Sequence, residues 1–559
     1  MNTLEKILLA SAAAVGIIFT FGPPPFQKPD ENRHYYQAEA LSRGVVGCRV
    51  DSSGQIYLPL PTSVATFPDA LKAGEIAHTP SVKFLLSSFG WYRYPSADPG
   101  VHETSWCSWS PVGYIPNAVG MLLGRVSGSR LVEFYLARLF GLAIFIAALI
   151  YGLSLTPAQF RSWLYLFALL PMTLHQASAV SYDVVQLAMV PIAYGLFTRF
   201  LVSRSRAPVG QIMIFALSLI LLVMVKPAYL PLLGLFFLVP PKVMAPGIKA
   251  YRARAALYLF FALAALLPVL RPSYYAGLSV LVNPGLQLAA SATHPLHVLS
   301  ALWVTFVGSA VTFYDGLVGN FGWLDYKLWE GWYFVVPAVF GYLLAAYRGK
   351  QVLSGKRLGA LAVLLLASVV AVAYSLYLIW TPVGANAIGG IQGRYFLLLV
   401  PFAGLLLAEA KRYGKVIAVV LAAIFLASLV GSLWNRYYNL SAWGENDRVV
   451  PEAGSGVTKL VRGVPYPLSF PGEKVKLVGL YWYPLAPPSA PIAYTITDHD
   501  CTNRVLSGYV QDTLGTNGVH EEAFGPVWVT APVCVVFSAD VGNVAGAGVA
   551  PRYLVPSIR

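Results

Sequence analysis

Long apolar stretches separated by short polar ones dominate this chain. A bilayer core takes about 20 apolar residues per helix, and shorter pieces suffice where a protein cavity thins the span. The first stretch covers roughly residues 7–21 and ends at a run of three prolines, 23–25. With it, the pattern predicts about eleven transmembrane helices, the others near residues 130–152, 162–180, 184–202, 209–225, 227–240, 254–271, 331–347, 358–380, 395–410 and 416–434.

The segment at residues 296–313 does not fit the alternation of sides. It is apolar enough to cross a membrane, but a crossing there would place the basic stretch RGKQVLSGKR (348–357) outside. Basic loops of this kind usually stay in the cytoplasm. We therefore expect a re-entrant or interface-lying helix at residues 296–313.

Basic residues in short loops orient the other predicted helices. Clusters near Arg204 and Arg252 and the stretch at 348–357 are assigned to the cytoplasm. This leaves on the outer side a large first loop at residues 22–129 and everything after Trp434. The N-terminal apolar run lacks a small-x-small cleavage site, so we expect an uncleaved helix with a cytoplasmic N-terminus.

Composition supports the same class of protein. Of 559 residues, 57% are hydrophobic and only 11% are charged, with a mean hydropathy of +0.62. Soluble domains carry about 25% charged residues, so an integral membrane protein is indicated. Much of the net charge of +14 falls in short loops, where it suits anionic lipid headgroups. Nucleic-acid binding is not expected.

The tail from about residue 441 has a different pattern. Strand-like runs such as VKLVGLYWYPL and VCVVFSAD alternate with Pro, Gly, Asn and Asp. This spacing predicts a β-sandwich of roughly a hundred residues. We therefore expect an α-helical transmembrane domain at residues 1–440, which includes the 22–129 loop, and a C-terminal β-sandwich domain at residues 441–559.

Four cysteines agree with the predicted outer side. Cys48 and Cys107 lie in the first loop, and Cys501 and Cys534 lie in the tail. Four cysteines allow three pairings, of which pairing within each domain is the most economical. Disulfides persist in oxidising compartments, so the outer side is expected to be a bacterial periplasm and the membrane the inner membrane. Four unpaired thiols are the alternative.

Ionisable residues gather toward the predicted outer face. The stretch PDENRHYYQAEALSRG, residues 29–44, places several of them just beyond the first helix. Charge next to hydrocarbon is costly and tends to be retained for function. The candidate site residues on this face are Asp30, Glu31, Arg33, His34, Asp183, Lys226, Asp325, Arg394 and Tyr395.

This set suits transfer of a sugar from a polyprenyl phosphate at the membrane surface. Asp30 or Glu31 is the expected general base that takes a proton from an acceptor hydroxyl. Lys226 and Arg394 are expected to hold the phosphate, on which negative charge builds as the glycosidic bond breaks. The other members would bind or orient substrate: Arg33, His34, Asp183, Asp325 and Tyr395.

Each assignment has a structural alternative. The acidic pair could simply begin a solvated loop. Lys226 could extend its ammonium to the interface, and Arg394 could pair with a carboxylate for packing. Asp183 could cap the next helix, and His34 could be a packed core histidine.

The motifs resemble a known group of membrane enzymes. A multi-pass chain with an acidic pair after the first helix, a large first outer loop and a soluble outer C-terminal domain resembles the GT-C superfamily of glycosyltransferases. More closely, PDENRHYYQAEALSRG, SPVGYIPNAVGMLLGR, VSYDVVQLA, VKPAYLPLL, FGWLD and QGRYFLLLVPF look like a bacterial multi-pass family catalogued as a domain of unknown function. The resemblance spans about residues 5–435.

The resemblance implies a catalytic carboxylate in the first outer loop, at Asp30 or Glu31, and a second acidic position at Asp183. It implies a polyprenyl-phosphate-linked sugar donor, a glycan or glycolipid acceptor, and the lipid bilayer as partners. Some members of that superfamily use a divalent cation, so Mg²⁺ or Mn²⁺ is left open here. A transporter or flippase of lipid-linked saccharides, or a polysaccharide polymerase or ligase, remains the alternative function.

Overall fold

The computed structural model describes residues 3–50, 56–78, 84, 101–102, 110–244, 282–336, 353, 355–406, 428–438, 444–446, 465–468, 474–483, 492–497, 501–510, 520–530, 533–537 and 548–555. The chain divides into two compact units. One contains Met1–Ala73 and Leu86–Leu433, and the other contains Gly74–Leu85 and Trp434–Arg559. The short piece 74–85 thus groups with the tail, whereas the sequence pattern assigned it to the membrane domain.

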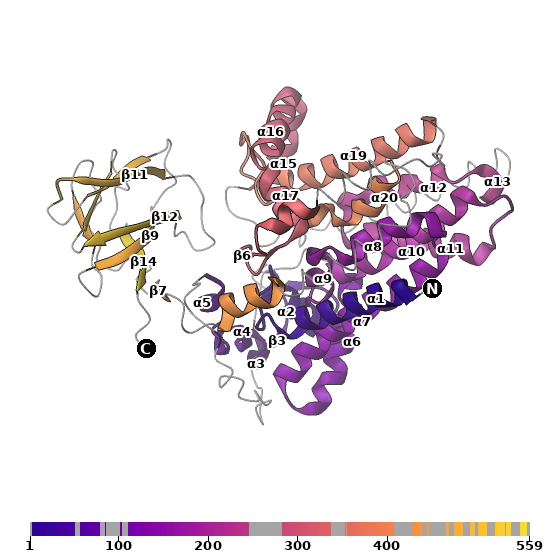
Figure 1. Cartoon of the computed structure of the whole chain (residues 1–559), viewed down its shortest axis with the longest axis horizontal. Helices are drawn as coiled ribbons and strands as arrows, with labels where there is room; N and C mark the ends of the chain where they lie inside the picture. The colour runs from indigo at the N-terminus through magenta and orange to yellow at the C-terminus, as the bar shows by residue number, and fades with distance from the viewer. Residues whose placement is uncertain are drawn as a thin grey trace. The chain divides into compact units, whose positions relative to one another are not determined.

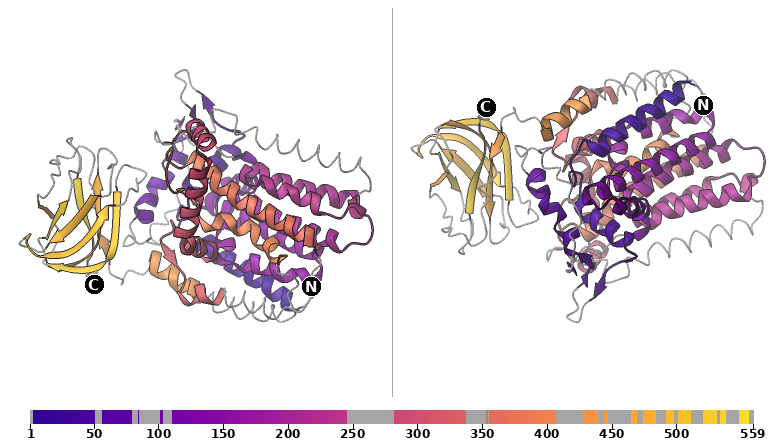
Figure 2. Two further views of the ribbon diagram at one scale, coloured as in Figure 1. Left: turned by 90° about the horizontal axis from the view of Figure 1, so that it is seen from above. Right: turned by 90° about the horizontal axis from the view of Figure 1, so that it is seen from below.

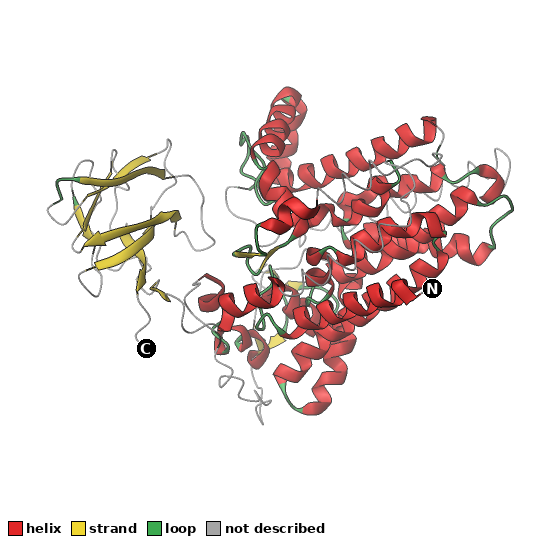
Figure 3. Ribbon diagram, viewed as in Figure 1, coloured by secondary structure: helices red, strands yellow, loops and turns green. Residues whose placement is uncertain are grey.

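The first unit is built from helices (Figure 1 and Figure 3). Its α-helices are α1 (Thr3–Phe21), α2 (Glu31–Ser42), α3 (Thr62–Ala65), α4 (Phe67–Ala70), α6 (Ile115–Gly124), α7 (Arg130–Leu155), α8 (Arg161–Leu169), α9 (Pro171–Ala177), α10 (Asp183–Val202), α11 (Val209–Val225), α12 (Leu235–Leu238), α13 (Pro241–Met244), α15 (Pro284–Thr293), α16 (Pro295–Gly308), α17 (Ala310–Val318), α19 (Gly355–Ile379) and α20 (Val400–Gly404).

Shorter elements connect these helices. The 3-10 turns are η2 (Pro111–Tyr114), η3 (Arg125–Ser127), η4 (Ala158–Phe160), η5 (Pro227–Gly234) and η8 (Gly393–Leu399). Three antiparallel strand pairs join β1 (Arg49–Val50) to β2 (Ile56–Tyr57), β3 (Leu60–Pro61) to β4 (Val101–His102), and β5 (Asn320–Phe321) to β6 (Tyr326–Lys327).

Helices α7 and α10 form the centre of this unit. Helices α1 and α6 pack against α7, and α11 packs against α10, so these elements lie side by side in Figures 1 and 2. Small residues allow the two central helices to approach closely. A Cβ atom added at Gly152 would lie 2.5 Å from the backbone of Pro191, and one added at Gly195 would lie 2.5 Å from the Gly152 carbonyl oxygen.

The structure supports a membrane protein. Among the described residues, three helices are long and apolar enough to cross a bilayer: α7, α10 and α19. A fourth candidate is the pair α16 and α17, which is bent by 61° and forms either a broken span or a re-entrant loop. The re-entrant helix at residues 296–313 and the count of eleven spans stay predictions.

Three predicted spans are not continuous α-helices, and proline explains each difference. The span at 162–180 breaks between α8 and α9 at Pro171, and the span at 227–240 begins as the 3-10 turn η5. The span at 395–410 likewise begins as η8 and becomes α-helical at Val400–Pro401. Proline removes a backbone donor and keeps the preceding residue from helical geometry. The span at 254–271, most of 331–347 and most of 416–434 lie outside the described residues.

The second unit carries two four-stranded antiparallel sheets (Figure 3). One has the order β11-β10-β13-β8 and the other β12-β9-β14-β7. Tyr494, Ile496, Val535 and Phe537 are buried on the paired strands β10 and β13. The elements are α5 (Ala73–His78), the π-helical turn η9 (Trp434–Tyr438), β7 (Gly444–Asn446), β8 (Tyr466–Leu468), β9 (Lys474–Tyr483), β10 (Ile492–Thr497), β11 (Arg504–Val510), β12 (His520–Thr530), β13 (Val533–Phe537) and β14 (Gly548–Val555).

The cysteines in the tail pair as the sequence predicted. Cys501 and Cys534 form a disulfide across 33 residues, which ties the start of β11 to β13. Cys48 is also disulfide-bonded. Its predicted partner, Cys107, lies outside the described residues.

A close backbone contact between α17 and η8 fixes the start of η8. A Cβ atom added at Gly393 would collide with the Phe313 carbonyl oxygen and lie 2.5 Å from the Leu317 amide nitrogen. Gly316 faces it from α17, 3.0 Å from the Gly393 nitrogen when a Cβ is added there. Only glycine at both positions permits this approach, which determines where the next residues of η8 lie.

Substitution of Gly393 by alanine is therefore expected to lower the thermal unfolding temperature of the detergent-solubilised protein. Overpacking of this kind costs about 1–3 kcal/mol or more. Gly308→Ala is the matched control, because Gly308 has open space around it and tolerates a methyl group. Equal unfolding temperatures for the two variants would contradict the close contact.

Candidate functional site

Glu31 forms a buried ion pair with Arg138 of α7. Arg138 Nε donates to Glu31 Oε1 at 2.8 Å and Arg138 Nη2 donates to Glu31 Oε2 at 2.6 Å. Both side chains are 0% exposed. A bidentate pair of this length is among the strong charge-assisted contacts in proteins. Glu31 is thus held in the protein interior, away from any substrate that approaches from water.

The same pair organises the backbone around it. Arg138 also donates to the carbonyl oxygens of Thr20, Pro23 and Pro24, at 2.7–2.9 Å. Glu31 Oε1 accepts from the backbone amide of Val180 at 3.1 Å. These bonds join the end of α1, the start of α2, α7 and the turn before α10. We call this group the Glu31–Arg138 clamp.

Asp30 has the opposite environment, although it is the neighbouring residue. Its side chain is 40% exposed, and its only printed ion pair is with Arg394, where Nη2 and Oδ2 lie 3.4 Å apart. Its backbone has φ 59°, in the left-handed region that aspartate tolerates better than most residues. Backbone strain of this kind is often found at functional sites.

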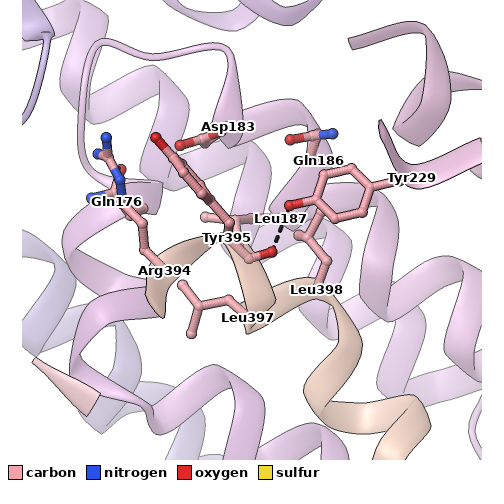
Figure 4. Close-up of a pocket in the computed structure, with 9 residues that line it drawn as sticks. All are labelled: Gln176, Asp183, Gln186, Leu187, Tyr229, Arg394, Tyr395, Leu397 and Leu398. Carbon is pink, nitrogen blue, oxygen red and sulfur yellow. Dashed lines mark hydrogen bonds between the residues drawn. The ribbon is translucent and has the colours of Figure 1, made fainter. Parts of the chain in front are cut away.

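Arg394 and Asp183 share a pocket (Figure 4). Arg394 is 7% exposed, and its Nη1 donates to Gln176 Oε1 at 3.3 Å. In Figure 4 the Arg394 guanidinium, the Tyr395 hydroxyl and the Asp183 carboxylate point to the same side of the pocket. The lining residues are Gln176, Asp183, Gln186, Leu187, Tyr229, Arg394, Tyr395, Leu397 and Leu398.

Lys226 reaches the same region because Pro227 ends α11. The residue before a proline avoids helical geometry, and Lys226 is extended with φ −141° and ψ 101°. Its ammonium lies 3.5 Å from the centroid of the Tyr395 ring, a cation–π contact. The Tyr229 hydroxyl donates to the Tyr395 carbonyl oxygen at 2.6 Å and so holds η5 against η8. Asp183 and Asp30 both interact electrostatically with Lys226.

His34 lies one helical turn after Asp30 and is surrounded by aromatic rings. Its Nδ1 is 2.8 Å from the Tyr114 hydroxyl, and its ring meets the Tyr182 ring edge-on at 4.9 Å. Burial lowers the pKa of the His34 imidazole well below its usual range, and the cations Arg394 and Lys226 lower it further. His34 is therefore neutral at physiological pH and able to accept a hydrogen bond.

Lys28 fixes the end of α9, next to Gln176. Its ammonium is fully buried and donates to the carbonyl oxygens of His175 and Ser178, at 3.2 and 2.5 Å, and to Ser178 Oγ at 2.9 Å. A cation at a helix C-terminus satisfies free carbonyls and complements the helix dipole. Burial lowers the pKa of Lys28 well below its usual range, as does Arg138.

Most predicted site residues come together, and two do not. Asp30, His34, Asp183, Lys226, Arg394 and Tyr395 surround one region. Asp325 is exposed in the turn between β5 and β6, and Arg33 is half-buried; neither lines the pocket. The sequence interpretation missed three lining residues, Gln176, Gln186 and Tyr229. Glutamines inside apolar spans were the available signal for two of them.

The donor set fits an anion better than a metal ion. Among the described residues, no group of three or more His, Cys, Asp or Glu side chains is placed to hold a metal. Instead, a guanidinium and an ammonium face the region between the Asp30 and Asp183 carboxylates. Such cations bind phosphate, Arg as a planar fork and Lys as a point charge.

Comparison with known proteins gives one family. A family model described as "Predicted membrane protein (DUF2142)" matches residues 14–403, well over half of the chain. No curated protein and no solved structure matches.

The two adjacent acids are expected to respond differently to removal of charge. Glu31→Gln leaves Arg138 buried without its counter-ion, which costs about 3–5 kcal/mol. Asp30→Asn loses a long, partly exposed contact worth about 0–1 kcal/mol. Thermal unfolding in detergent should show a large drop for the first variant and little change for the second. A reversed or equal response would contradict the clamp.

Acid is expected to destabilise the protein partly through His34. The folded state keeps His34 neutral, whereas the unfolded chain protonates it below about pH 6.5. The unfolded state then binds more protons, so stability falls as pH falls. Between pH 6.5 and 5.5, His34→Gln should lose less stability than wild type, by up to about 1.4 kcal/mol per pH unit. Parallel pH profiles of the unfolding temperature would show that His34 titrates normally.

Proposed function

The chain belongs to the DUF2142 family of predicted membrane proteins, and we propose that it is a membrane glycosyltransferase. It transfers a sugar from a polyprenyl-phosphate donor to a glycan or glycolipid acceptor. The observation that carries this proposal is the 3.4 Å contact between Asp30 and Arg394, which places a solvent-accessible carboxylate beside a buried phosphate-binding cation.

Arg394 and Lys226 hold the donor phosphate in this proposal. They approach from different elements, η8 and the break between α11 and η5, and Tyr395 lies beside both, with ring-to-cation distances of 5.5 and 3.5 Å. As the bond between the sugar and the phosphate oxygen breaks, its electron pair goes to that oxygen. Two cations that are already in place stabilise the developing charge without reorganisation.

Asp30 is the general base. The acceptor hydroxyl oxygen forms a bond to the sugar's anomeric carbon, and its proton goes to the Asp30 carboxylate. We assign this role to Asp30 and not to Glu31, because both Glu31 oxygens are occupied in the buried clamp. Asp30 is 40% exposed and can meet an acceptor that comes from water.

The remaining residues of the site orient the substrates. Asp183 lies at the first turn of α10 and offers a carboxylate to sugar hydroxyls, as do the amides of Gln176 and Gln186 from neighbouring helices. Neutral His34 accepts a hydrogen bond. Since no trio of metal ligands is present among the described residues, the two cations are the groups assigned to the phosphate; a divalent cation, Mg²⁺ or Mn²⁺, stays an open addition.

The cellular setting follows from the same proposal. A polyprenyl tail requires the bilayer, and the predicted orientation places the site on the periplasmic side of a bacterial inner membrane. The apolar helices and the disulfide between Cys501 and Cys534 support this setting. The acceptor is then a component of the cell envelope.

A transporter of lipid-linked saccharides is the second candidate. Transporter sites are often formed by discontinuous helices, and here α11 breaks at Pro227 while α16 and α17 bend by 61°. Mass spectrometry of the saccharide separates the possibilities. A flippase leaves its mass unchanged, a transferase adds one sugar, and a polymerase or ligase adds whole blocks.

Asp30→Asn is expected to reduce sugar transfer in membranes by about 10²- to 10⁴-fold, the usual contribution of a general base. The assay follows labelled sugar from polyprenyl phosphate into the acceptor fraction. Asp325→Asn is the matched control, because Asp325 is an exposed carboxylate outside the pocket. Full activity of Asp30→Asn, at wild-type protein levels, would remove the base from the mechanism.

A further inference from the structure

Two adjacent acids of this protein hold their arginines very differently. Glu31 contacts Arg138 through two bonds of 2.6 and 2.8 Å, with both side chains fully buried. Asp30 contacts Arg394 through one long bond of 3.4 Å and is 40% exposed. The first contact is built to persist. The second is weak enough for a better anionic partner to replace it.

The backbone at Asp30 shows that its carboxylate has been turned toward Arg394. Asp30 occupies the position before the first residue of α2, where an aspartate usually accepts a hydrogen bond from the helix N-terminus. Its side chain makes no such cap bond. Its backbone is also in the left-handed region, which costs about 1–3 kcal/mol for a residue other than glycine.

Arg394 has unused capacity for hydrogen bonding. Its Nη1 bond to Gln176 is 3.3 Å and its Nη2 bond to Asp30 is 3.4 Å, both long for charge-assisted bonds. Its Nε has no hydrogen-bond partner among the residues that the structure describes, although the side chain is 93% buried (7% exposed). A buried guanidinium with an unsatisfied donor faces a pocket and waits for an acceptor.

We infer that the Asp30–Arg394 pair is a resting-state latch that the donor phosphate opens. The inference rests on the proposed function. A phosphate oxygen takes the Nε and Nη positions of Arg394 and displaces the Asp30 carboxylate. Asp30 is then released toward the acceptor side. The base becomes available only after the donor is bound, so the enzyme binds its donor first.

The charge count of the site favours this exchange. Two cations, Arg394 and Lys226, face two carboxylates, Asp30 and Asp183, so the site is formally balanced when empty. A phosphodiester adds one negative charge. One carboxylate must give up its contact, and Asp30 has the weaker hold and the more exposed side chain. Gln176 keeps the guanidinium in place during the exchange, since its Oε1 contacts a different nitrogen.

The latch gives Asp30→Asn two effects of opposite sign. Transfer is lost because the base is missing, yet polyprenyl phosphate binds more tightly because nothing competes for Arg394. A weak, partly exposed ion pair contributes about 0.2–1 kcal/mol, so the gain in affinity should be about two- to five-fold. No other proposed role for Asp30 requires tighter binding that depends on Arg394.

A double-mutant cycle tests the latch on the full chain in lipid nanodiscs. Binding of polyprenyl phosphate is measured for wild type, Asp30→Asn, Arg394→Gln and the double variant. Wild type should bind two- to five-fold more weakly than Asp30→Asn, whereas Arg394→Gln and the double variant should bind equally. This coupling isolates the pair from the general loss of one negative charge.

Each outcome separates the latch from the function on which it rests. If Asp30→Asn binds no tighter than wild type, or if it tightens binding equally in the Arg394→Gln background, the latch is wrong while the glycosyltransferase proposal stands. If Arg394→Gln leaves polyprenyl-phosphate affinity unchanged, Arg394 is not the phosphate ligand. Both proposals then fail.

Discussion

The buried ion pair between Glu31 and Arg138 is the contact on which the site depends. Removing two charges from water is expensive, and the cost is met here by a bidentate geometry and by further bonds to backbone groups. Those bonds reach the end of α1, the start of α2 and the turn before α10. Asp30 directly precedes Glu31, and Asp183 follows Val180 by three residues. The pair therefore sets the positions of both carboxylates of the site.

Around this fixed part, proline and glycine place the cations. Pro227 ends α11 and turns Lys226 out of helical geometry, toward the ring of Tyr395. Gly393 lets η8 approach α17 so closely that no side chain fits, and Arg394 is the next residue. Fixed cations in a largely dehydrated pocket interact more strongly with an anion than they would in water. The fold thus supplies an anion site before any ligand arrives.

The sequence predicted the class of fold and much of the site, and physical reasons explain the rest. Apolar length identified the spans that became α7, α10, α11 and α19, and alternation identified the strands of the tail. The interruptions at Pro171 and Pro401 were visible as prolines but not as 3-10 or broken geometry. The choice between Asp30 and Glu31 could not be made, because it depends on Arg138, which lies 107 residues from Glu31 in the chain. The Asp30–Arg394 contact spans 364 residues and has no local signal.

The central claim is that Arg394 and Lys226 hold a lipid-linked phosphate beside Asp30. The most direct measurement is a cryo-EM structure of the full chain in nanodiscs with polyprenyl phosphate bound. The account predicts phosphate density within about 3 Å of the Arg394 guanidinium and close to the Lys226 ammonium, with the Asp30 carboxylate moved away from Arg394. Phosphate density elsewhere on the protein, with the Asp30–Arg394 contact intact, would contradict it.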